Sequence, residues 1–444
     1  MSAVTTERAA VAELHDALID LLGPRGVSTD RRMLERASVD GARMSPVISE
    51  MLPLGVAEIV AFPTTASEIA RVVQEAVARG IPVTPRGKGT GNYGQAIPSA
   101  GGLVLDTSRA RNIVEVSDGS ITADAGAPLA QLEQAARASG QQLWMYPSTL
   151  NSSIGGFLAG GSGGTGTIAH GANHMGFVAA LDVVHADGSG LTHVEGEEAQ
   201  LYVHNYGTAG IIARATVRLE PAVAWRALYA SFPSFSGALS VIRELGRLDP
   251  LPRLVSADTI EVSAALPEDP AIPPGRSSLR TIAHPEAVEE ATRIIEAAGG
   301  RIEAVREGAT EGAKLSSLSY NHPIEWLQRS RPGHYYHLEV AGDVLADDID
   351  LVHATIGDGL LHIEAGHTVP IGMLASEYTG PEDVEAAIER LTAIGVGVHN
   401  CHQWNVDFEM GRTIERARTT DPFGLLNPGK LNPDYTGPQK GSIR

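Results

Sequence analysis

Two glycine-rich segments constrain the fold of this chain more than any other feature of its sequence. The first, PVTPRGKGTGNYGQAIP from Pro82 to Pro98, holds four glycines, with Arg86 and Lys88 beside the first two. The second, PSTLNSSIGGFLAGGSGGTG from Pro147 to Gly166, holds seven. Glycine suits positions where the backbone takes positive φ or lies very close to another group. Because a run of such positions can turn successive N–H groups inward as an anion-binding nest, the first segment predicts an anion site.

Two common phosphate motifs do not explain the first segment. Gly89–Gly94 matches G-x-G-x-x-G, but Pro98 and the glycines after it exclude the helix that a Rossmann site needs. A Walker A loop is absent from the sequence as well. A glycine-rich hairpin would explain one segment alone. The second segment favours a shared ligand, because the apolar residues Ile154, Phe157 and Leu158 run through it and a flexible linker would not need them. We expect the two segments to wrap one extended anionic ligand.

Length and charge narrow the class of protein. The 444 residues exceed the size at which one hydrophobic core usually divides, so two or more domains are expected. A formal net charge of −19 argues against nucleic acid or an anionic membrane surface as a partner. No apolar run is long enough to span a bilayer, and the N-terminus reads as an amphipathic helix rather than a signal peptide.

Cysteine usage limits the redox chemistry available to the chain. Cys401 is the only cysteine, which excludes intrachain disulfides, iron–sulfur clusters and c-type haem attachment. We therefore expect a reducing, cytoplasmic location. If the protein is a redox enzyme, its electrons must pass to O₂ or to a separate carrier.

The order of expected elements indicates two domains. Strand, helix and strand are expected from Val56 to Arg86, with a capping box at Thr65 and Glu68 opening the helix. Another helix is expected with Pro128 at its first position. From about Trp225 the pattern changes to alternating strands and helices. The predicted divisions are a helical N-terminal segment 1–51, a first domain 52–222, a second domain 223–410 and a C-terminal return 411–444.

Four segments, taken in chain order, resemble a known family. They are PRGKGTGNYGQ, PSTLNSSIGGFLAGGSGGTG, GTAGIIARATVRLEP and DPFGLLNPGKL. Together they resemble the flavin-binding fold shared by vanillyl-alcohol oxidase, p-cresol methylhydroxylase and the glycolate/D-lactate dehydrogenase group. The resemblance covers roughly residues 52–221 and the tail. It implies an α+β, two-domain flavoprotein: an FAD-binding domain of the p-cresol methylhydroxylase type, and a cap domain with an antiparallel sheet covered by helices.

The same resemblance implies which residues contact FAD. The first loop would cradle the diphosphate, mainly through backbone N–H groups, with Arg86, Gly87, Lys88, Gly89, Thr90, Gly91 and Asn92. Other implied contacts are Pro147, Ser148, Thr149, Ser153, Ile154, Gly155 and Gly156 at the flavin, Gly160, Ser162, Gly163 and Gly164 at the phosphate and ribose, Gly210, Ile211 and Ile212 at the adenine, and Asn427 and Lys430 in the tail.

One departure from the family bears on how FAD is held. Relatives that attach FAD covalently through the first loop often carry histidine where this chain has Thr90. Cys401 lies in the other half of the sequence, so a second attachment through cysteine is not expected either. We therefore predict non-covalent FAD.

Three pairs of histidines in the second half allow three interpretations. The pairs are His334 and His337, His362 and His367, and His399 and His402. Neutral imidazoles suit Zn²⁺ or Fe²⁺. Alternatively, one or two of them act as a general base toward a substrate hydroxyl. They can also be structural or surface histidines.

We favour a catalytic role for His402 first and His399 second, a structural role for His334, His362 and His367, and no metal ligand. The stretch HNCHQW, which includes Asn400, resembles an Asn-x-His-x-aromatic segment that related FAD-linked oxidases place where the second domain returns to the flavin.

Two further groups in the second half are candidates for the site. SYNHPIEW, with Tyr320 and His322, resembles another segment close to the active site of such enzymes. Arg329 and Arg331 could clamp a substrate carboxylate, although a solvated basic turn is the favoured interpretation.

The expected reaction is oxidation of a CH–OH group of a small substrate, a hydroxy acid or related alcohol, by hydride transfer to flavin N5. One alternative is oxidation of a para-substituted phenol or benzylic alcohol, with Tyr335 and Tyr336 as candidate groups around a phenolate. Another is a flavin-binding protein without turnover. A homodimer is left open, since no residue argues for it.

Overall fold

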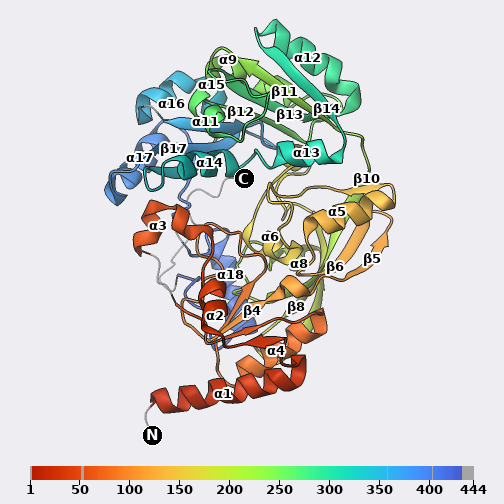
Figure 1. Cartoon of the computed structure of the whole chain (residues 1–444), viewed down its shortest axis with the longest axis vertical. Coiled ribbons are helices and arrows are strands. Elements are labelled where there is room, and N and C mark those ends of the chain that lie inside the picture. Colours follow the sequence, from red (N-terminus) through yellow and green to blue (C-terminus); the bar gives the residue numbers. More distant parts are fainter. Residues whose placement is uncertain (1–2, 52–54, 358, 403, 433–444) are drawn as a thin grey trace.

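The computed structural model describes residues 3–51, 55–357, 359–402 and 404–432. The chain forms two halves (Figure 1). The lower half in that view contains two sheets, and the upper half is built on a third. Among the described residues, no helix is long and apolar enough to cross a membrane.

The first sheet carries the first glycine loop. Its strand order is β1 (Val27–Ser28), β2 (Ile59–Ala61), β4 (Leu103–Asp106) and β3 (Val83–Arg86), and β4 pairs with β2 and with β3 in parallel. Helices α1 (Ala3–Leu22), α2 (Arg31–Ala37) and α4 (Ala66–Ala78) contact this sheet, whereas η1 (Gly41–Met44) and α3 (Pro46–Met51) lie against the cap. Leu14 and Leu18 of α1 pack with Ile69 and Val73 of α4 in one core, so the N-terminal helix belongs to this half.

Two helices begin within one residue of the positions that the sequence predicts for them. At α4, the Thr65 hydroxyl accepts a hydrogen bond from the Glu68 N–H at 3.1 Å, as predicted. The Glu68 carboxylate, however, accepts from the N–H of Thr64 rather than of Thr65, so the reciprocal half of the capping box is displaced by one residue. Helix α5 (Leu129–Ala138) has Pro128 as its N-cap and not as its first helical residue.

The second sheet has six strands and carries the second glycine segment beside it. The order is β5 (Ile113–Ser117), β6 (Ser120–Asp124), β10 (Ile211–Pro221), β8 (Val178–Val184) and β9 (Leu191–Glu195), with β7 (Gln141–Leu143) also paired to β10. The elements around it are η2 (Thr107–Arg109), α5, α6 (Ile154–Gly160), α7 (Thr167–His170) and α8 (Gly196–Gln200). Ile154, Phe157 and Leu158 of α6 are buried in the same core as the strands, which rules out a flexible linker.

The third sheet forms the cap. Its order is β14 (Arg301–Glu307), β11 (Arg226–Phe232), β13 (Ser277–Ala283), β12 (Leu254–Asp258), β16 (Leu360–Glu364), β17 (Ile371–Glu377), β15 (Tyr335–Ala341) and β18 (Gly397–His399). The pairings between these described strands are all antiparallel. The expected α+β class, with an antiparallel cap sheet, is confirmed.

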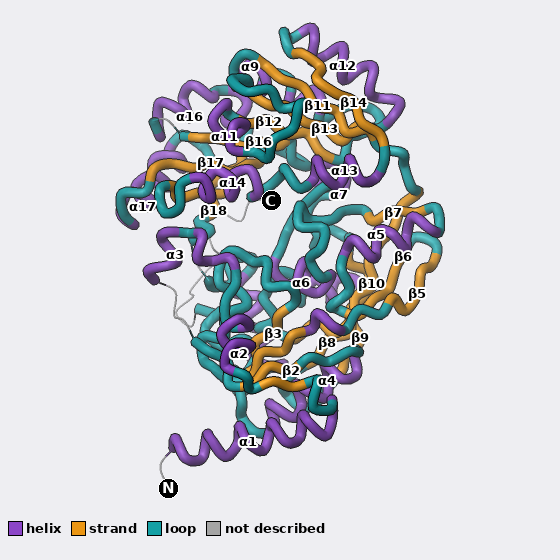
Figure 2. Tube along the Cα trace, in the orientation of Figure 1, coloured by secondary structure: helices purple, strands orange, loops and turns teal. Residues whose placement is uncertain are grey.

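Helices cover both faces of the cap sheet (Figure 2). One face packs against α9 (Phe235–Leu239), α10 (Ile242–Leu245), α12 (Val288–Ala297), α15 (Val344–Asp347), α16 (Ile349–Ile356) and α17 (Pro381–Ala393), with η3 (Pro285–Ala287) leading into α12. The other face packs against α11 (Ile260–Ala265), α13 (Ala309–Ser316) and α14 (His322–Ser330). Helices α13 and α14 lie on the side that faces the lower half.

The chain returns to the lower half after the cap. Helix α18 (Met410–Thr420) lies against it, where the Arg416 guanidinium donates to the Tyr202 hydroxyl at 2.9 Å. Beyond the helix, the Val83 N–H donates to the Leu425 carbonyl at 2.8 Å, which ties the tail to strand β3. The tail therefore supports the strand from which the first glycine loop begins.

Candidate FAD and substrate site

One cleft is lined by both glycine segments and by side chains of the cap. Its empty volume is about 1580 Å³, including the part open to solvent. The same cleft therefore joins the two loops predicted to bind FAD with residues of the cap.

The first loop combines close packing with backbone amides that have no acceptor among the described residues. A side chain at Gly87 is excluded, because a Cβ there would lie 2.1 Å from the Ser153 hydroxyl oxygen, and Gly89 has φ +63°. Within the described part of the chain, no backbone N–H from Gly87 to Asn92 donates a hydrogen bond. Such donors suit the diphosphate of FAD.

The second segment packs closely on its surroundings and on the first loop. A Cβ on Gly155 would lie 2.7 Å from the Cβ of Ala125, so α6 can approach the sheet only with glycine there. The hydroxyls of Thr90 and Ser152 are 3.0 Å apart and join the two segments. Both segments therefore form one continuous wall.

Most of the predicted FAD contacts lie along this wall. The predicted residues that line the cleft are Arg86, Gly87, Lys88, Gly89, Thr90, Gly91, Asn92, Pro147, Ser148, Thr149, Ser153, Gly155, Gly156, Gly160, Ser162, Gly163, Ile211 and Ile212. Those that do not are Ile154, Gly164, Gly210, Asn427 and Lys430. Ile154 is part of the core, and a Cβ on Gly210 would meet Val183 and Tyr202.

Asn427 and Lys430 support the first loop from behind. The Lys430 ammonium is fully buried and donates to the Gly94 carbonyl at 2.7 Å. Burial lowers its pKa to about 8, against the opposing charge of Asp40. The Asn427 amide donates to the carbonyls of Gln95 and Tyr206 at 2.9 and 2.8 Å. They hold the loop in shape rather than line the cleft.

The cap contributes the opposite wall through the start of α14. Tyr320, Asn321, His322 and Glu325 line the cleft. Nδ1 of His322 lies 2.8 Å from the Ser317 carbonyl oxygen, which can only accept, so Nδ1–H donates and Nε2 is the acceptor nitrogen of the neutral ring. Tyr320 has φ +54°, and its hydroxyl donates to the Thr167 hydroxyl at 2.9 Å. This hydrogen bond joins the cap wall to the FAD-binding half.

A histidine between two carboxylates completes the cap wall. Nδ1 of His399 is 2.7 Å from Oε2 of Glu339, and Nε2 contacts Oδ2 of Asp407. Burial disfavours the charged ring, but the two carboxylates outweigh burial and raise the pKa of His399 well above its ordinary value. Burial would also raise the pKa of Asp407, yet the hydrogen bond from His399 lowers it to about 2. His399 is therefore an imidazolium held by two carboxylates.

The other oxygen of Asp407 faces a different environment. Oδ1 is buried and has no hydrogen-bond partner among the described residues. His204, which also lines the cleft, has its Nε2 3.8 Å away. Burial lowers the pKa of His204, so its ring is neutral near pH 7.

His402 and Asn400, predicted as catalytic, do not line the cleft. His402 is only 5% exposed, and its Nδ1 lies 2.6 Å from the Ser45 hydroxyl. The Asn400 side chain accepts from the His402 backbone N–H at 3.0 Å. Burial lowers the pKa of His402 to about 4. Of the predicted catalytic residues, the structure brings His399, Tyr320 and His322 to the cleft and leaves these two behind it.

His402 also belongs to a group with metal-ligating atoms. Those of His337, Cys401 and His402 lie within 4.8 Å of one another. The Gln328 amide donates to Nδ1 of His337 at 3.2 Å, and the Cys401 thiol donates to the His337 carbonyl. Since these contacts explain two of the three side chains without an ion, we assign no metal to the group.

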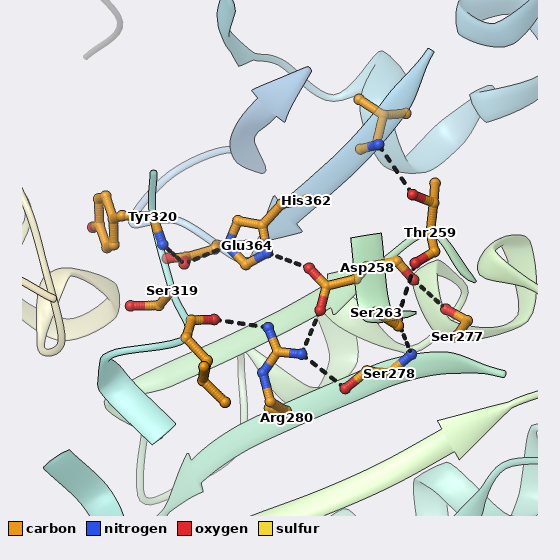
Figure 3. Close-up of polar contacts among 12 residues, drawn as sticks. Asp258, Thr259, Ser263, Ser277, Ser278, Arg280, Ser319, Tyr320, His362 and Glu364 are labelled. Carbon is orange, nitrogen blue, oxygen red and sulfur yellow. Dashed lines mark hydrogen bonds and ion pairs between the residues drawn. The ribbon is translucent and has the colours of Figure 1, made fainter. Parts of the chain in front are cut away.

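The remaining cap histidines lie outside the cleft lining. His362 is fully buried between Asp258 and Glu364, at 2.6 and 2.8 Å (Figure 3). Nδ1 of His367 is 2.9 Å from the Ile168 carbonyl, and His334 is 3.8 Å from Glu377.

Several groups at the site carried no signal in the sequence. Glu339 and Asp407 are isolated acids in their segments, and His204 and Tyr206 follow no motif. Only the cap sheet, in which β15 pairs with β18, brings Glu339 beside His399. The stretch HNCHQWNVDF did contain Asp407, but nothing marked it.

Comparisons with known proteins agree with this geometry. Residues 57–192 match the family described as FAD binding domain. The chain is 30% identical over 200 residues to D-lactate dehydrogenase of Archaeoglobus fulgidus. That match covers 43% of this chain and 45% of that protein. It is 27% identical to D-2-hydroxyglutarate dehydrogenase of Xanthomonas citri pv. viticola over 85% of this chain and 90% of that protein. The chain spans less than half the length of the first three curated relatives it matches.

A solved structure of p-cresol methylhydroxylase with substrate bound shares the fold. Its TM-score is 0.70 at 15% identity, with 96% of this chain and 97% of that chain covered. Fold, cleft and family match together define a two-domain α+β flavoprotein that binds FAD. The chain has the fold of p-cresol methylhydroxylase, as the four sequence motifs predict. These relatives are named as dehydrogenases or as an FAD-linked oxidoreductase, the class that the sequence predicts for this chain.

Proposed function

We propose that this protein oxidises a CH–OH carbon of a small substrate. The observation that carries the proposal is one cleft that is lined both by the glycine segments predicted to bind FAD and by His322, whose Nδ1 is held by the Ser317 carbonyl. FAD, when bound, supplies the redox chemistry by accepting the hydride at N5. The names D-lactate dehydrogenase and D-2-hydroxyglutarate dehydrogenase both refer to substrates with such a carbon, which supports the proposal.

His322 takes the hydroxyl proton in this proposal. The Ser317 carbonyl fixes the proton on Nδ1, so Nε2 is the atom that accepts. A neutral imidazole is suited to this step near neutral pH. The role that the sequence favoured for His402 therefore passes to His322.

His399 has a different role. Because both of its nitrogens are held by carboxylates and its pKa is raised, it stays protonated and is a poor base near pH 7. It provides a fixed positive charge that keeps Glu339 and Asp407 in place at the cap wall.

The phenol alternative has less support. Tyr335 and Tyr336, its candidate groups, do not line the cleft, and Tyr336 is buried in the cap core. No arginine of the cap lines the described part of the cleft to hold a phenolate. A flavin-binding protein without turnover would not need the free imidazole nitrogen of His322 in the cleft.

Anaerobic bleaching of the flavin absorbance tests the proposal. A panel of hydroxy acids, sugars and benzylic alcohols is offered, and the substrate that reduces the flavin is then used with variants. We expect His322→Gln to slow flavin reduction by about 10²–10⁴-fold, the usual contribution of a general base. The matched control His402→Gln should retain reduction within a few-fold. Failure of every CH–OH donor, or equal rates in H322Q and the wild type, would contradict the proposal.

A further inference from the structure

We propose that the substrate is an uncharged or cationic alcohol rather than the anion of a 2-hydroxy acid. This inference rests on the proposed function and names the substrate class of the same cleft. It follows from the charges at the cap end and from one unpartnered oxygen there.

The cap wall of the cleft is acidic. Glu325, Glu339 and Asp407 all line it, and His399 is its only cation among the described lining residues. His399 is shared between Glu339 and Asp407, so these three groups together carry one net negative charge. Like charges inside a partly enclosed cleft repel more strongly than in water, so this wall disfavours a substrate that carries a carboxylate.

No other cation is placed to bind a carboxylate at this end. Arg86 and Lys88 are the remaining cations of the lining, and both belong to the FAD loop. The Arg86 guanidinium already donates to the carbonyls of Ala37 and Val39. Bidentate arginine is the usual partner of a substrate carboxylate, and this wall does not present one.

The two arginines considered from the sequence lie elsewhere. Neither Arg329 nor Arg331 lines the cleft. Arg329 stacks over Trp326 and is 3.6 Å from Glu325, while Arg331 donates to the Tyr335 hydroxyl at 3.4 Å. Arg329 partly offsets the charge of Glu325. Asp407 and Glu339 therefore decide which charge on a substrate the cap wall favours.

Asp407 supplies the independent observation that points to a ligand. It is only 8% exposed, lines the cleft, and its Oδ1 has no hydrogen-bond partner within the described residues. A buried carboxylate oxygen without a donor favours a ligand that brings one. A hydroxyl or an ammonium of the substrate can donate to Oδ1. A 2-hydroxy acid has a hydroxyl as well, so it is the negative charge of Asp407 and Glu339 that disfavours its carboxylate.

A preference for an uncharged or cationic substrate would distinguish this protein from the relatives whose names refer to hydroxy acids. Their match to this chain is 27–30% identical, which leaves room for a different cap wall.

Three compounds with one carbon skeleton test the charge preference. D-lactate, (R)-propane-1,2-diol and (R)-1-amino-2-propanol all have the form CH₃–CH(OH)–X, and X is a carboxylate, a hydroxymethyl or an aminomethyl group. Each is titrated anaerobically into the FAD-loaded protein, and the change in the flavin spectrum gives a dissociation constant and, where it bleaches, a reduction rate. We expect the diol and the amino alcohol to bind at least about tenfold more tightly than lactate. Added salt should weaken the amino alcohol most.

Variants connect the preference to the named residues. Asp407→Asn removes the charge at similar size. It should reduce the ratio of the dissociation constants of lactate and the amino alcohol by about tenfold. Glu325→Gln, which keeps an oxygen for the Asn92 amide, is the second variant if D407N does not hold FAD. Glu377→Gln changes an exposed carboxylate outside the cleft and should leave all three constants unchanged.

The outcomes separate the two proposals. Tighter binding of lactate, an unchanged ratio in D407N, or no spectral response to any of the three compounds overturns the charge preference. Tight binding of the diol or amino alcohol without bleaching supports the charge preference and counts against the proposed oxidation. Bleaching by lactate alone supports the oxidation and overturns the charge preference.

Discussion

At the scale of single residues, His399 and His402 lie in one short segment but in different surroundings. Residues three apart on an extended segment point to opposite sides, so both rings cannot face one cleft. His399 ends strand β18 and faces the cleft, whereas His402 is buried against Ser45. The sequence places both histidines in one segment but does not give the direction of each side chain. The tautomer of His322 likewise depends on the Ser317 carbonyl, which no motif marks.

Asp407 gives a prediction of pH-dependent stability. Its pKa is about 2 in the folded protein and 3.8 in the reference state, so its ionised form stabilises the fold above pH 3.8. The difference corresponds to about 2 kcal/mol at neutral pH, and about half is lost by roughly pH 3 as the pH falls toward the folded pKa. We expect Asp407→Asn to lower the free energy of unfolding by about this amount at pH 7. Urea titrations of both proteins at several pH values measure the difference in their free energies of unfolding. If that difference does not become smaller in acid, the lowered pKa of Asp407 is contradicted.

At the scale of elements, local motifs located the FAD loops well and the cap wall poorly. The glycine segments are continuous in sequence, and their conformation is set by residues close in the chain, such as Ser153 at the N-cap of α6. The cap wall joins α14, β15, β18 and the loop before α18, which only the sheet order brings together. Hydrophobic periodicity predicts that such elements exist but does not give the order in which strands pair.

A buried network positions the turn that leads into α14. The Arg280 guanidinium contacts Asp258 and donates to the Leu318 carbonyl at 2.8 Å, while Glu364 accepts from the Tyr320 N–H at 2.7 Å (Figure 3). Asp258, Arg280 and His362 are fully buried, so their charges depend on one another. Both ends of the turn before His322 are therefore anchored to the core of the cap sheet.

Removing Glu364 should loosen this turn. Glu364→Ala leaves the His362 ring and the Tyr320 N–H without their acceptor, and breaking a buried ionic group costs about 3–5 kcal/mol. The conservative Glu364→Gln keeps an oxygen for both donors and should cost less. Hydrogen exchange at the Tyr320 amide measures how far the turn is loosened, and chemical denaturation measures the loss of stability. Equal protection of that amide in the wild type and E364A would contradict the role of the network.

At the scale of the whole molecule, FAD is expected to stabilise the assembly because residues from distant segments meet around it. The first loop depends on β3, on the tail through Lys430, and on the second segment through Thr90 and Ser152. The resemblance of four ordered motifs predicted this arrangement, and the two-domain fold is confirmed. What it did not predict was which motif residues line the cleft and which support it from behind, because that depends on packing between segments far apart in sequence.

Loss of FAD should therefore be reversible and should destabilise the protein. Thr90 stands where covalent relatives carry histidine, so we expect acid to release the flavin into the supernatant and leave a colourless pellet. Because a ligand that binds only the folded state adds about 2.7 kcal/mol at a hundredfold excess over its dissociation constant, the apoprotein should unfold at lower temperature and recover as FAD is added. Lys430→Met, which removes the link to Gly94, should weaken this recovery more than a change of Lys314, an exposed lysine outside the cleft, does. A yellow pellet would show a covalent bond instead, and the histidines that line the cleft, His204, His322 and His399, would then be the residues to examine for the attachment.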